Sequence, residues 1–301
     1  MRELVIISGK GGTGKTSLTA SFASLANNAI LCDADVDAAD LHLLMNPTIQ
    51  QQTDFQGGNQ AEIDKFKCTE CGLCIDLCRF DAISPTFEVS PIDCEGCGVC
   101  VDFCPEQTIN FPVKTCGQWF ISDTKCGPMV HARLGIAEEN SGKLVALVRQ
   151  EAKKLAENQN KQLIITDGPP GIGCPVIASM GGATALLVVA EPTVSGIHDM
   201  ERVIQLAFSF KIPVMICVNK FDLNVDQTEA IITFAKNHDI PFVGKIPFNP
   251  IFTKAMIQGK TVLEYDSESD AGLAVKQVWE NMIKSPAMNS ADHLEFNIEP
   301  N

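Results

Sequence analysis

The chain has 301 residues, and 45% of them are hydrophobic, which is enough for a buried α/β core and for two domains. A formal net charge of −14 opposes nonspecific binding to DNA phosphates and to anionic membrane surfaces, and so favours protein partners. No segment approaches the ~20 apolar residues of a transmembrane helix, and the sequence from Met1 shows no signal peptide. We expect a cytoplasmic protein that inserts into no membrane and binds no nucleic acid.

The first chemical motif follows an apolar run at residues 4–7, which predicts a buried parallel strand. A glycine-rich turn comes next, and a helix-compatible segment begins at Ser17. A turn of this kind aims backbone N–H groups at one point, where the helix dipole adds positive potential for an anion. We therefore interpret it as a phosphate-binding loop. Its predicted nucleotide-binding residues are Gly11, Gly12, Thr13, Gly14, Lys15, Thr16 and Ser17.

Two lysines in this loop have different predicted roles. Lys15 is expected to reach the β- and γ-phosphates of ATP, while the Thr16 hydroxyl binds Mg²⁺, which prefers oxygen ligands. Lys10 lies too early in the loop to fold easily onto its own phosphates, so we expect it to point outward. In this respect the loop resembles the deviant Walker A motif of the MinD/ParA/Mrp and nitrogenase iron protein superfamily. The resemblance implies an ATPase that dimerises through its ATP sites, with Lys10 contacting the nucleotide of the facing subunit.

A second apolar run at residues 29–32 leads into four carboxylates, those of Asp33, Asp35, Asp37 and Asp40. Such acids can be solvated loop residues. Beside a phosphate-binding loop, however, both Mg²⁺ and an attacking water need a carboxylate near the γ-phosphate. The stretch resembles switch I of the same superfamily, in which one aspartate orients water and another supports the metal. We assign Asp35 to the water and Asp33 to the support, and the choice between them stays open here.

The sequence turns polar from Gln50 to Gln60, which predicts a domain boundary, and a cysteine array follows. Residues 68–78 and 94–104 share the spacing C-x2-C-x2-C-x3-C. This repeat is typical of two-[4Fe–4S] bacterial ferredoxins, in which the fourth cysteine of each run binds the other cluster. A zinc ribbon is the alternative, but zinc takes two pairs of ligands rather than two quartets. The predicted sets are Cys68, Cys71, Cys74 and Cys104 for one cluster, and Cys94, Cys97, Cys100 and Cys78 for the other.

The cysteine-rich segment also carries much of the charge. From Gln60 to Val113 there are ten acidic residues against three basic ones, a net charge of −7 that is half of the chain's total. We interpret this segment as a docking face for a basic redox partner. Arg79 stands where a proline usually follows the first quartet, and a guanidinium there would raise the potential of the nearby cluster.

The α/β pattern resumes near Lys114, so the ferredoxin-like unit is predicted to be an insertion. Residues 119–121 predict a strand, 127–132 a turn and an edge strand, and 141–156 an amphipathic helix. Residues 138–143 resemble a stretch of MinD-like ATPases with an inserted ferredoxin, to which we assign no role. A further apolar run ends at Asp167, in the position of a Walker B acid that binds Mg²⁺ through water.

Cys174 lies seven residues after Asp167, an offset that matches a cluster-ligating cysteine of the nitrogenase iron protein. The second ligand of that protein would come from the start of the helix at Ser141, where this sequence has no cysteine. Two Cys174 thiolates across a dimer are only half of the four that a bridging [4Fe–4S] cluster requires. A small packed residue, a transient metal or redox contact and a shared cluster all stay open.

Further apolar runs at 185–190, 214–218 and 242–246 predict three more strands. Asn219 follows the second of these strands, and its amide can pair with the edge of adenine. The superfamily usually packs its base after the third strand, which implies a similar place for Pro247. A helix at 271–284 closes the fold, and an acidic tail without Lys or Arg, residues 285–301, is predicted to be disordered.

These features predict an α/β P-loop NTPase with a mostly parallel sheet and helices on both faces, and with a small inserted α+β bacterial-type ferredoxin domain. The predicted division is 1–58 and 114–284 for the ATPase, 59–113 for the ferredoxin and 285–301 for the tail. ATP or ADP, Mg²⁺ and two [4Fe–4S] clusters are the expected cofactors. The favoured function is an ATPase whose dimerisation and hydrolysis gate electron transfer to a protein partner. The alternatives are an iron–sulfur carrier or assembly ATPase of the Mrp type and, less favoured, a positioning ATPase that senses redox state.

Overall fold

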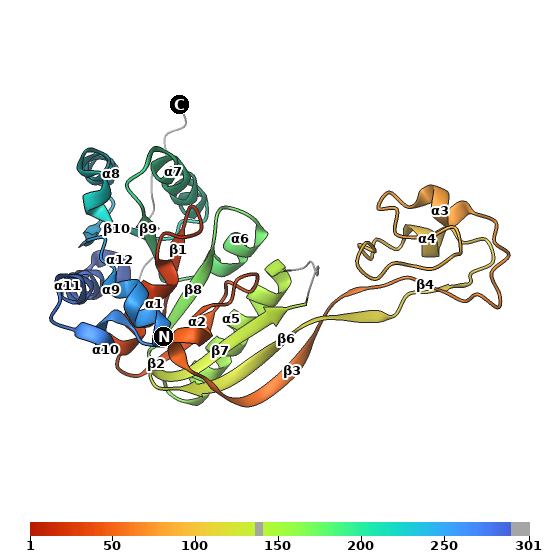
Figure 1. The fold of residues 1–301 in the computed structure, drawn as a ribbon, viewed down its shortest axis with the longest axis horizontal. Coiled ribbons are helices and arrows are strands. Elements are labelled where there is room, and N and C mark those ends of the chain that lie inside the picture. The colour runs from red at the N-terminus through yellow and green to blue at the C-terminus, as the bar shows by residue number, and fades with distance from the viewer. Residues whose placement is uncertain (136–140, 290–301) are drawn as a thin grey trace.

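The computed structural model describes residues 1–135 and 141–289, and its centre is a nine-stranded sheet. The strands are β1 (Arg2–Ser8), β2 (Ala29–Asp33), β3 (Thr48–Asn59), β6 (Val113–Thr124), β7 (Gly127–Leu134), β8 (Leu163–Pro170), β9 (Ala185–Ala190), β10 (Val214–Asn219) and β11 (Phe242–Ile246). Their order is β11-β10-β9-β1-β8-β2-β7-β6-β3 (Figure 1). All neighbouring pairs are parallel except β7–β6 and β6–β3. The predicted mostly parallel sheet is therefore confirmed.

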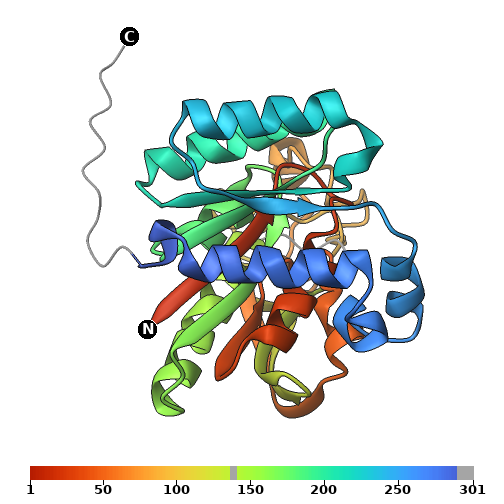
Figure 2. The same cartoon turned by 90° about the vertical axis from the view of Figure 1, so that its left-hand side faces the viewer.

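Helices cover both faces of this sheet (Figures 1 and 2). One face packs against α1 (Lys15–Leu25), α2 (Leu41–Met45), α9 (Ile251–Ile257), α10 (Val262–Asp266), α11 (Asp270–Lys284) and α12 (Pro286–Asn289). The other packs against α5 (Ser141–Asn158), α6 (Cys174–Met180), α7 (Val194–Ser209) and α8 (Val225–Asn237), which follows the short 3₁₀ helix η1 (Phe221–Leu223). Leu4 and Ile6 of β1 join the first core, while Val5 and Ile7 join the second. Burial on both sides explains why this strand is continuously apolar.

β3 and β6, of 12 residues each, pair antiparallel and extend beyond the helical layers as a two-stranded arm (Figure 1). Residues 60–112 form a small unit at the far end of this arm. It contains β4 (Glu62–Ile63), α3 (Leu73–Leu77), α4 (Val99–Asp102) and β5 (Ile109–Asn110), with β4 and β5 paired antiparallel. Both helices begin after a glycine in the left-handed region, Gly72 with φ 81° and Gly98 with φ 75°, a conformation that costs glycine little.

Three sequence-based expectations differ from the structure. Residues 50–59, predicted as a polar boundary, belong to β3, because a two-stranded arm satisfies its backbone without burying an apolar face. Residues 127–132, predicted as a turn and an edge, belong to β7, an interior strand between β2 and β6. In the predicted tail, residues 286–289 form α12, since Ala287 and Met288 bury their side chains in the core.

A buried ion pair fastens α5 to the sheet. The Arg149 guanidinium donates to both carboxylate oxygens of Glu3 at 2.8 Å, and it also donates to the carbonyls of Ala178 and Gly181. Glu3 is 4% exposed and Arg149 6% exposed. Lys153 contacts the same carboxylate at 3.2 Å, but its side chain is 36% exposed. Arg149 thus joins β1, α5 and the end of α6.

Arg149→Met is expected to lower the free energy of unfolding by about 3–5 kcal/mol, because it leaves the Glu3 carboxylate buried without its main partner. Urea unfolding followed by circular dichroism measures the change. Lys153→Met is the matched control and should cost at most about 1 kcal/mol, as a partly solvated ion pair does. Equal losses from the two variants would contradict this account of Glu3.

Candidate functional site

The predicted phosphate-binding loop connects β1 to α1 at the carboxyl edge of the sheet. Gly12 and Gly14 have φ values of 78° and 88°, so both lie in the left-handed region that favours glycine. A Cβ atom at Gly14 would also lie 2.4 Å from Nδ2 of Asn219. The Thr13 hydroxyl is buried and has no hydrogen-bond partner in the part of the chain that the structure describes. The loop therefore offers a buried donor to a ligand in addition to its backbone.

Lys15 lies buried among carboxylates that come from neighbouring strands. Its Nζ is 3.2 Å from Oδ1 of Asp167 and 3.3 Å from Oδ2 of Asp35. Asp33, at the end of β2, pairs in register with Asp167 of β8, so the sheet itself brings these two acids together. Asp167 also accepts hydrogen bonds from the hydroxyls of Thr16, at 2.7 Å, and Thr19, at 2.8 Å.

The charges of this cluster depend on one another. Burial alone would lower the pKa of Lys15, but the carboxylates of Asp167, Asp35 and Asp33 outweigh it and raise that pKa. Burial raises the pKa of Asp33 well above its usual range, and the neighbouring Asp167 adds to the increase. Burial likewise raises the pKa of Asp35, although the charge of Lys15 opposes the change. Lys15 is thus the cation that allows these acids to lie together.

The two switch I aspartates have different environments. Asp33 is fully buried, and its carboxylate accepts from the backbone N–H groups of Asp35 at 3.2 Å and Leu41 at 3.3 Å. Asp35 is 7% exposed and directs a carboxylate oxygen at Lys15. Asp33 therefore shapes the loop, whereas Asp35 faces the ammonium group.

Lys10 does not point freely outward as the sequence predicted. Its Nζ lies 3.0 Å from Oε2 of Glu191 and donates to the Thr193 hydroxyl at 3.1 Å. Lys220 donates to the same Glu191 and to the Gly12 carbonyl, both at 2.9 Å. Burial would raise the pKa of Glu191, but the hydrogen bonds from Lys220 and Lys10 lower it. In a single chain the Lys10 ammonium thus takes the nearest carboxylate of its own subunit.

The Asn219 side chain bonds to its own chain, and its predicted contact with adenine stays a prediction. Its Nδ2 donates to the Thr13 carbonyl at 2.7 Å, and its Oδ1 accepts from the backbone of Lys220. It thereby holds the phosphate-binding loop. Together with the other predicted base-packing residue, Pro247, it also lines a cavity of about 190 Å³ beside the loop. The other lining residues are Gly14, Ser17, Lys220, Phe248, Asn249, Phe252 and Thr253.

The predicted cysteine sets lie around two separate cavities in the unit of residues 60–112. One cavity is lined by Cys68, Cys71, Cys74 and Cys104, and the other by Cys78, Cys94, Cys97 and Cys100. Within residues 1–135 and 141–289, no three or more His, Cys, Asp or Glu side chains are grouped to hold a single metal ion. The structure thus brings the members of each predicted quartet to one cavity.

Cys174 is exposed at the start of α6, and a Cβ atom added at Gly142, the second residue of α5, would lie 3.4 Å from the Cβ of Cys174. In the resemblance to the nitrogenase iron protein, the second cluster ligand would come from Ser141, the residue before Gly142. Part of the stretch 138–143, namely residues 138–140, lies outside the described residues. Among the described helices, none is long and apolar enough to cross a membrane.

Several site residues were not assigned from the sequence. Glu191 and Lys220 come directly after β9 and β10, at the carboxyl edge of the sheet where Asp33 ends β2. That position was the available signal. Thr19 lies four residues after Lys15, on the same face of a helix. Its contact with Asp167 could have been anticipated from that spacing.

The fold and the loop geometry define a P-loop nucleotide-binding protein. A model of the CobQ/CobB/MinD/ParA nucleotide-binding domain matches residues 4–262. An uncharacterized protein of Methanocaldococcus jannaschii is 32% identical over 283 residues, covering 93% of this chain and 96% of the relative. An uncharacterized ATP-binding protein of the same organism is 23% identical over 292 residues, covering 93% and 87%.

The fold is also similar to that of MinD from Pyrococcus horikoshii, solved in complex with Mg-ADP. That likeness has a TM-score of 0.59 at 17% identity and covers 94% of this chain and 96% of the solved one. The chain belongs to the CobQ/CobB/MinD/ParA family of nucleotide-binding proteins. Membership of this family confirms the prediction of an ATPase.

Proposed function

We propose that this protein is an ATP-hydrolysing iron–sulfur protein in which dimerisation and hydrolysis control electron transfer from two [4Fe–4S] clusters to a protein partner. One observation carries the proposal. Eight cysteines in two crossed quartets line two cavities at the end of an arm, and the first strand of that arm begins soon after switch I. The chain divides accordingly into an ATPase of residues 1–58 and 114–284 and an inserted ferredoxin of residues 59–113.

The nucleotide site suits Mg²⁺ and ATP. The Thr16 hydroxyl and the Asp167 carboxylate, 2.7 Å apart, are oxygen ligands of the kind that Mg²⁺ prefers, with Asp167 acting through water. Lys15 would exchange its carboxylate partners for the β- and γ-phosphates, and the Thr13 hydroxyl would donate to a phosphate oxygen. We assign Asp35 to the attacking water, because the carboxylate of Asp33 is already engaged by the loop backbone.

The cysteine sets suit two [4Fe–4S] clusters, which supply one-electron redox chemistry when bound. A cubane places its four irons at separate corners, so its thiolates stand farther apart than the ligands of a single ion. Backbone N–H groups already donate to three of the sulfurs. The backbone N–H of Glu70 donates to Sγ of Cys68, and that of Ala82 donates to Sγ of Cys78, both at 3.4 Å. The backbone N–H of Thr108 donates to Sγ of Cys104 at 3.5 Å. Such bonds stabilise thiolates and tune cluster potential.

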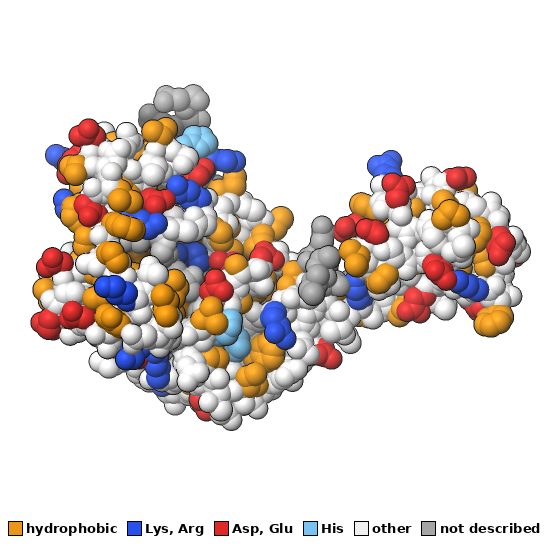
Figure 3. Space-filling model, in the orientation of Figure 1, with side chains coloured by type: hydrophobic (Ala, Val, Ile, Leu, Met, Phe, Trp, Pro, Cys, Tyr) orange, Lys and Arg blue, Asp and Glu red, His pale blue; other side chains and the backbone are white. Residues whose placement is uncertain are grey.

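The surface of the inserted unit suits a protein partner. Its net charge of −7 would steer a basic protein toward it, and acidic side chains are visible over it in Figure 3. Phe66, Phe80 and Phe103 are exposed on the same unit. Exposed aromatic groups among charges are typical of interface cores with a polar rim. The proposed acceptor is therefore a basic redox protein.

The connection to the nucleotide site runs through switch I. Asp33 accepts a hydrogen bond from the backbone of Leu41, the first residue of α2, and β3 follows α2 within three residues. A movement of this loop on hydrolysis would therefore act on the root of the arm that carries the cysteines. In the dimer, Lys10 would leave Glu191 and contact the nucleotide of the facing subunit, as the deviant Walker A motif implies.

Two lysine substitutions are expected to separate ATP binding from dimerisation of the chain, namely Lys10→Ala and Lys15→Ala. Lys15→Ala should weaken ATP binding on the order of 100-fold, since it removes a charged donor to phosphate worth roughly 3 kcal/mol. Lys10→Ala should leave binding nearly unchanged but abolish ATP-dependent dimerisation and slow hydrolysis at least about 10³-fold, as loss of a charge supplied in trans does. Calorimetry, light scattering and phosphate release measure the three quantities, with exposed Lys236→Ala as the control. Hydrolysis unaffected by Lys10→Ala would refute the sandwich dimer.

The proposed function is tested on protein reconstituted without oxygen. We expect about eight iron and eight sulfide per chain, from two complete quartets. Cys104→Ala should perturb the cluster held with Cys68, Cys71 and Cys74, whereas Cys126→Ala, outside both sets, should not change the iron content. Iron near four per wild-type chain would contradict the two-cluster proposal.

A second readout separates the favoured function from a carrier or assembly ATPase, which the exposed cysteine sites also suit. The reduced, ⁵⁷Fe-labelled protein is mixed with cytochrome c, a basic redox probe, or with an apo-ferredoxin, in the presence of ATP or ADP. Faster reduction of the probe with ATP, without loss of ⁵⁷Fe, supports electron transfer. Movement of ⁵⁷Fe into the apo-ferredoxin would support the carrier instead.

A further inference from the structure

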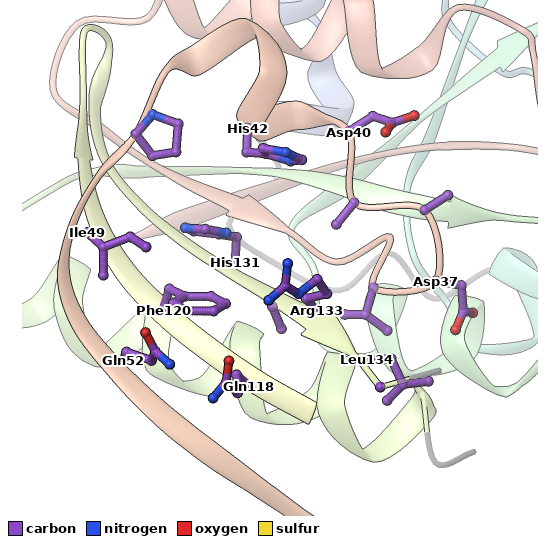
Figure 4. Close-up of a pocket in the computed structure, with 16 residues that line it drawn as sticks. Asp37, Asp40, His42, Ile49, Gln52, Gln118, Phe120, His131, Arg133 and Leu134 are labelled. Carbon is purple, nitrogen blue, oxygen red and sulfur yellow. The ribbon is translucent and has the colours of Figure 1, made fainter. Parts of the chain in front are cut away.

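A further cavity, of about 750 Å³, lies beside switch I and is lined by none of the residues that contact Lys15 (Figure 4). Its volume falls in the range of roughly 300–1,000 Å³ that small-molecule sites occupy. The switch I segment 36–40 and His42 line one side, and β6 and β7 line another. Pro47, Ile49 and Gln52 complete it at the start of β3. The carboxyl ends of β2 and β7 thus meet at this cavity, where parallel sheets commonly bind ligands.

Arg133 gives the cavity a cation. Its side chain is exposed and makes no ion pair or side-chain hydrogen bond within the described part of the chain. Figure 4 shows its guanidinium between His42 and the strands of β6 and β7. A guanidinium presents donors in a planar fork that matches a carboxylate or a phosphate. An anionic group is therefore the natural ligand of this part of the cavity.

The wall beside Arg133 is flat and largely apolar. Phe120 stacks on His131 with ring centroids 5.0 Å apart, and Nε2 of His131 lies 2.9 Å from the hydroxyl of the buried Ser122. Burial, with a smaller effect from His42, lowers the pKa of His131 to about 4, so its ring is neutral near pH 7. Leu134 and Ile49 add aliphatic surface. A ring or another flat apolar group fits against such a wall.

Two acidic side chains of the cavity limit the negative charge that a ligand can carry there. Asp37 and Asp40 line the switch I side, so they disfavour a second negative charge there. Gln118 donates to Asp54 at 3.0 Å, which fixes the position of its amide beside the cavity, and Gln52 adds another amide. The cavity therefore combines the Arg133 guanidinium, neutral hydrogen-bonding groups and a flat apolar wall.

We propose that this cavity binds a small organic anion, with its single carboxylate or phosphate on Arg133 and its flat apolar body against Phe120. The segment 36–40 continues directly from Asp35, so a ligand there constrains the loop that holds the catalytic carboxylates. Occupancy then changes the rate of ATP hydrolysis, and nucleotide changes the affinity for the anion by linkage. The site does not depend on the presence of clusters.

The test is calorimetric titration of the whole chain with benzoate and phenyl phosphate, and with acetate and inorganic phosphate as probes that lack a ring. The aromatic probes are expected to bind at least tenfold more tightly than their counterparts, and comparison of the two shows which anionic group is preferred. Arg133→Gln should weaken this binding at least tenfold, while Arg202→Gln, an exposed arginine on α7, should not. Circular dichroism checks that both variants fold.

Absence of saturable binding by either aromatic probe, or equal affinity in Arg133→Gln and wild type, would overturn the proposed site. The hydrolysis rate is then measured at saturating probe. A change of at least twofold in wild type that is lost in Arg133→Gln supports the coupling to switch I. An unchanged wild-type rate would overturn that coupling.

Discussion

The burial of the Lys15 ammonium among three carboxylates is the interaction on which the rest of this structure depends. The phosphate-binding loop follows β1, Asp33 ends β2 with Asp35 just after it, and Asp167 lies in β8, so parallel strands in register bring the group together. None of these charges would be stable in a buried position without the others, because each isolated charge carries a large desolvation cost. ATP and Mg²⁺ carry the same combination of negative and positive charge, and they can therefore enter by exchanging partners within the cluster.

The same carboxyl edge explains how remote parts of the chain reach the site. Glu191 and Lys220 follow neighbouring strands and hold Lys10 and the loop backbone, while switch I leads through α2 into the arm. The arm is polar, carries the inserted unit away from the helical layers and leaves a hollow beside the nucleotide domain (Figure 3). An acidic unit at the end of a ladder of backbone hydrogen bonds can meet a partner protein without disturbing the ATPase core.

Local patterns predicted the repeating parts of this molecule well. The apolar runs at β1, β2 and β8–β10 are buried on both faces of the sheet, so their sequences predict these strands without knowledge of their neighbours. The P-loop and the cysteine quartets were found for a related reason, since fixed spacing encodes their local geometry. β3 escaped prediction because its pairing with β6 joins residues far apart in sequence and buries little. The contact of Lys10 with Glu191 and the cavity at Arg133 also depend on tertiary placement, which a single sequence does not report.

The central claim is that the nucleotide site and the cysteine-rich unit are thermodynamically coupled through switch I and the arm. Electrochemical titration of the reconstituted clusters with no nucleotide, with ADP and with a non-hydrolysable ATP analogue measures this coupling directly. If the electron changes ATP-analogue affinity tenfold, linkage requires a shift of about 59 mV for a one-electron couple. We expect the analogue to shift the titration curve relative to ADP. Three superimposable curves would contradict it, and would mean that the two units are joined by the arm but act independently at equilibrium.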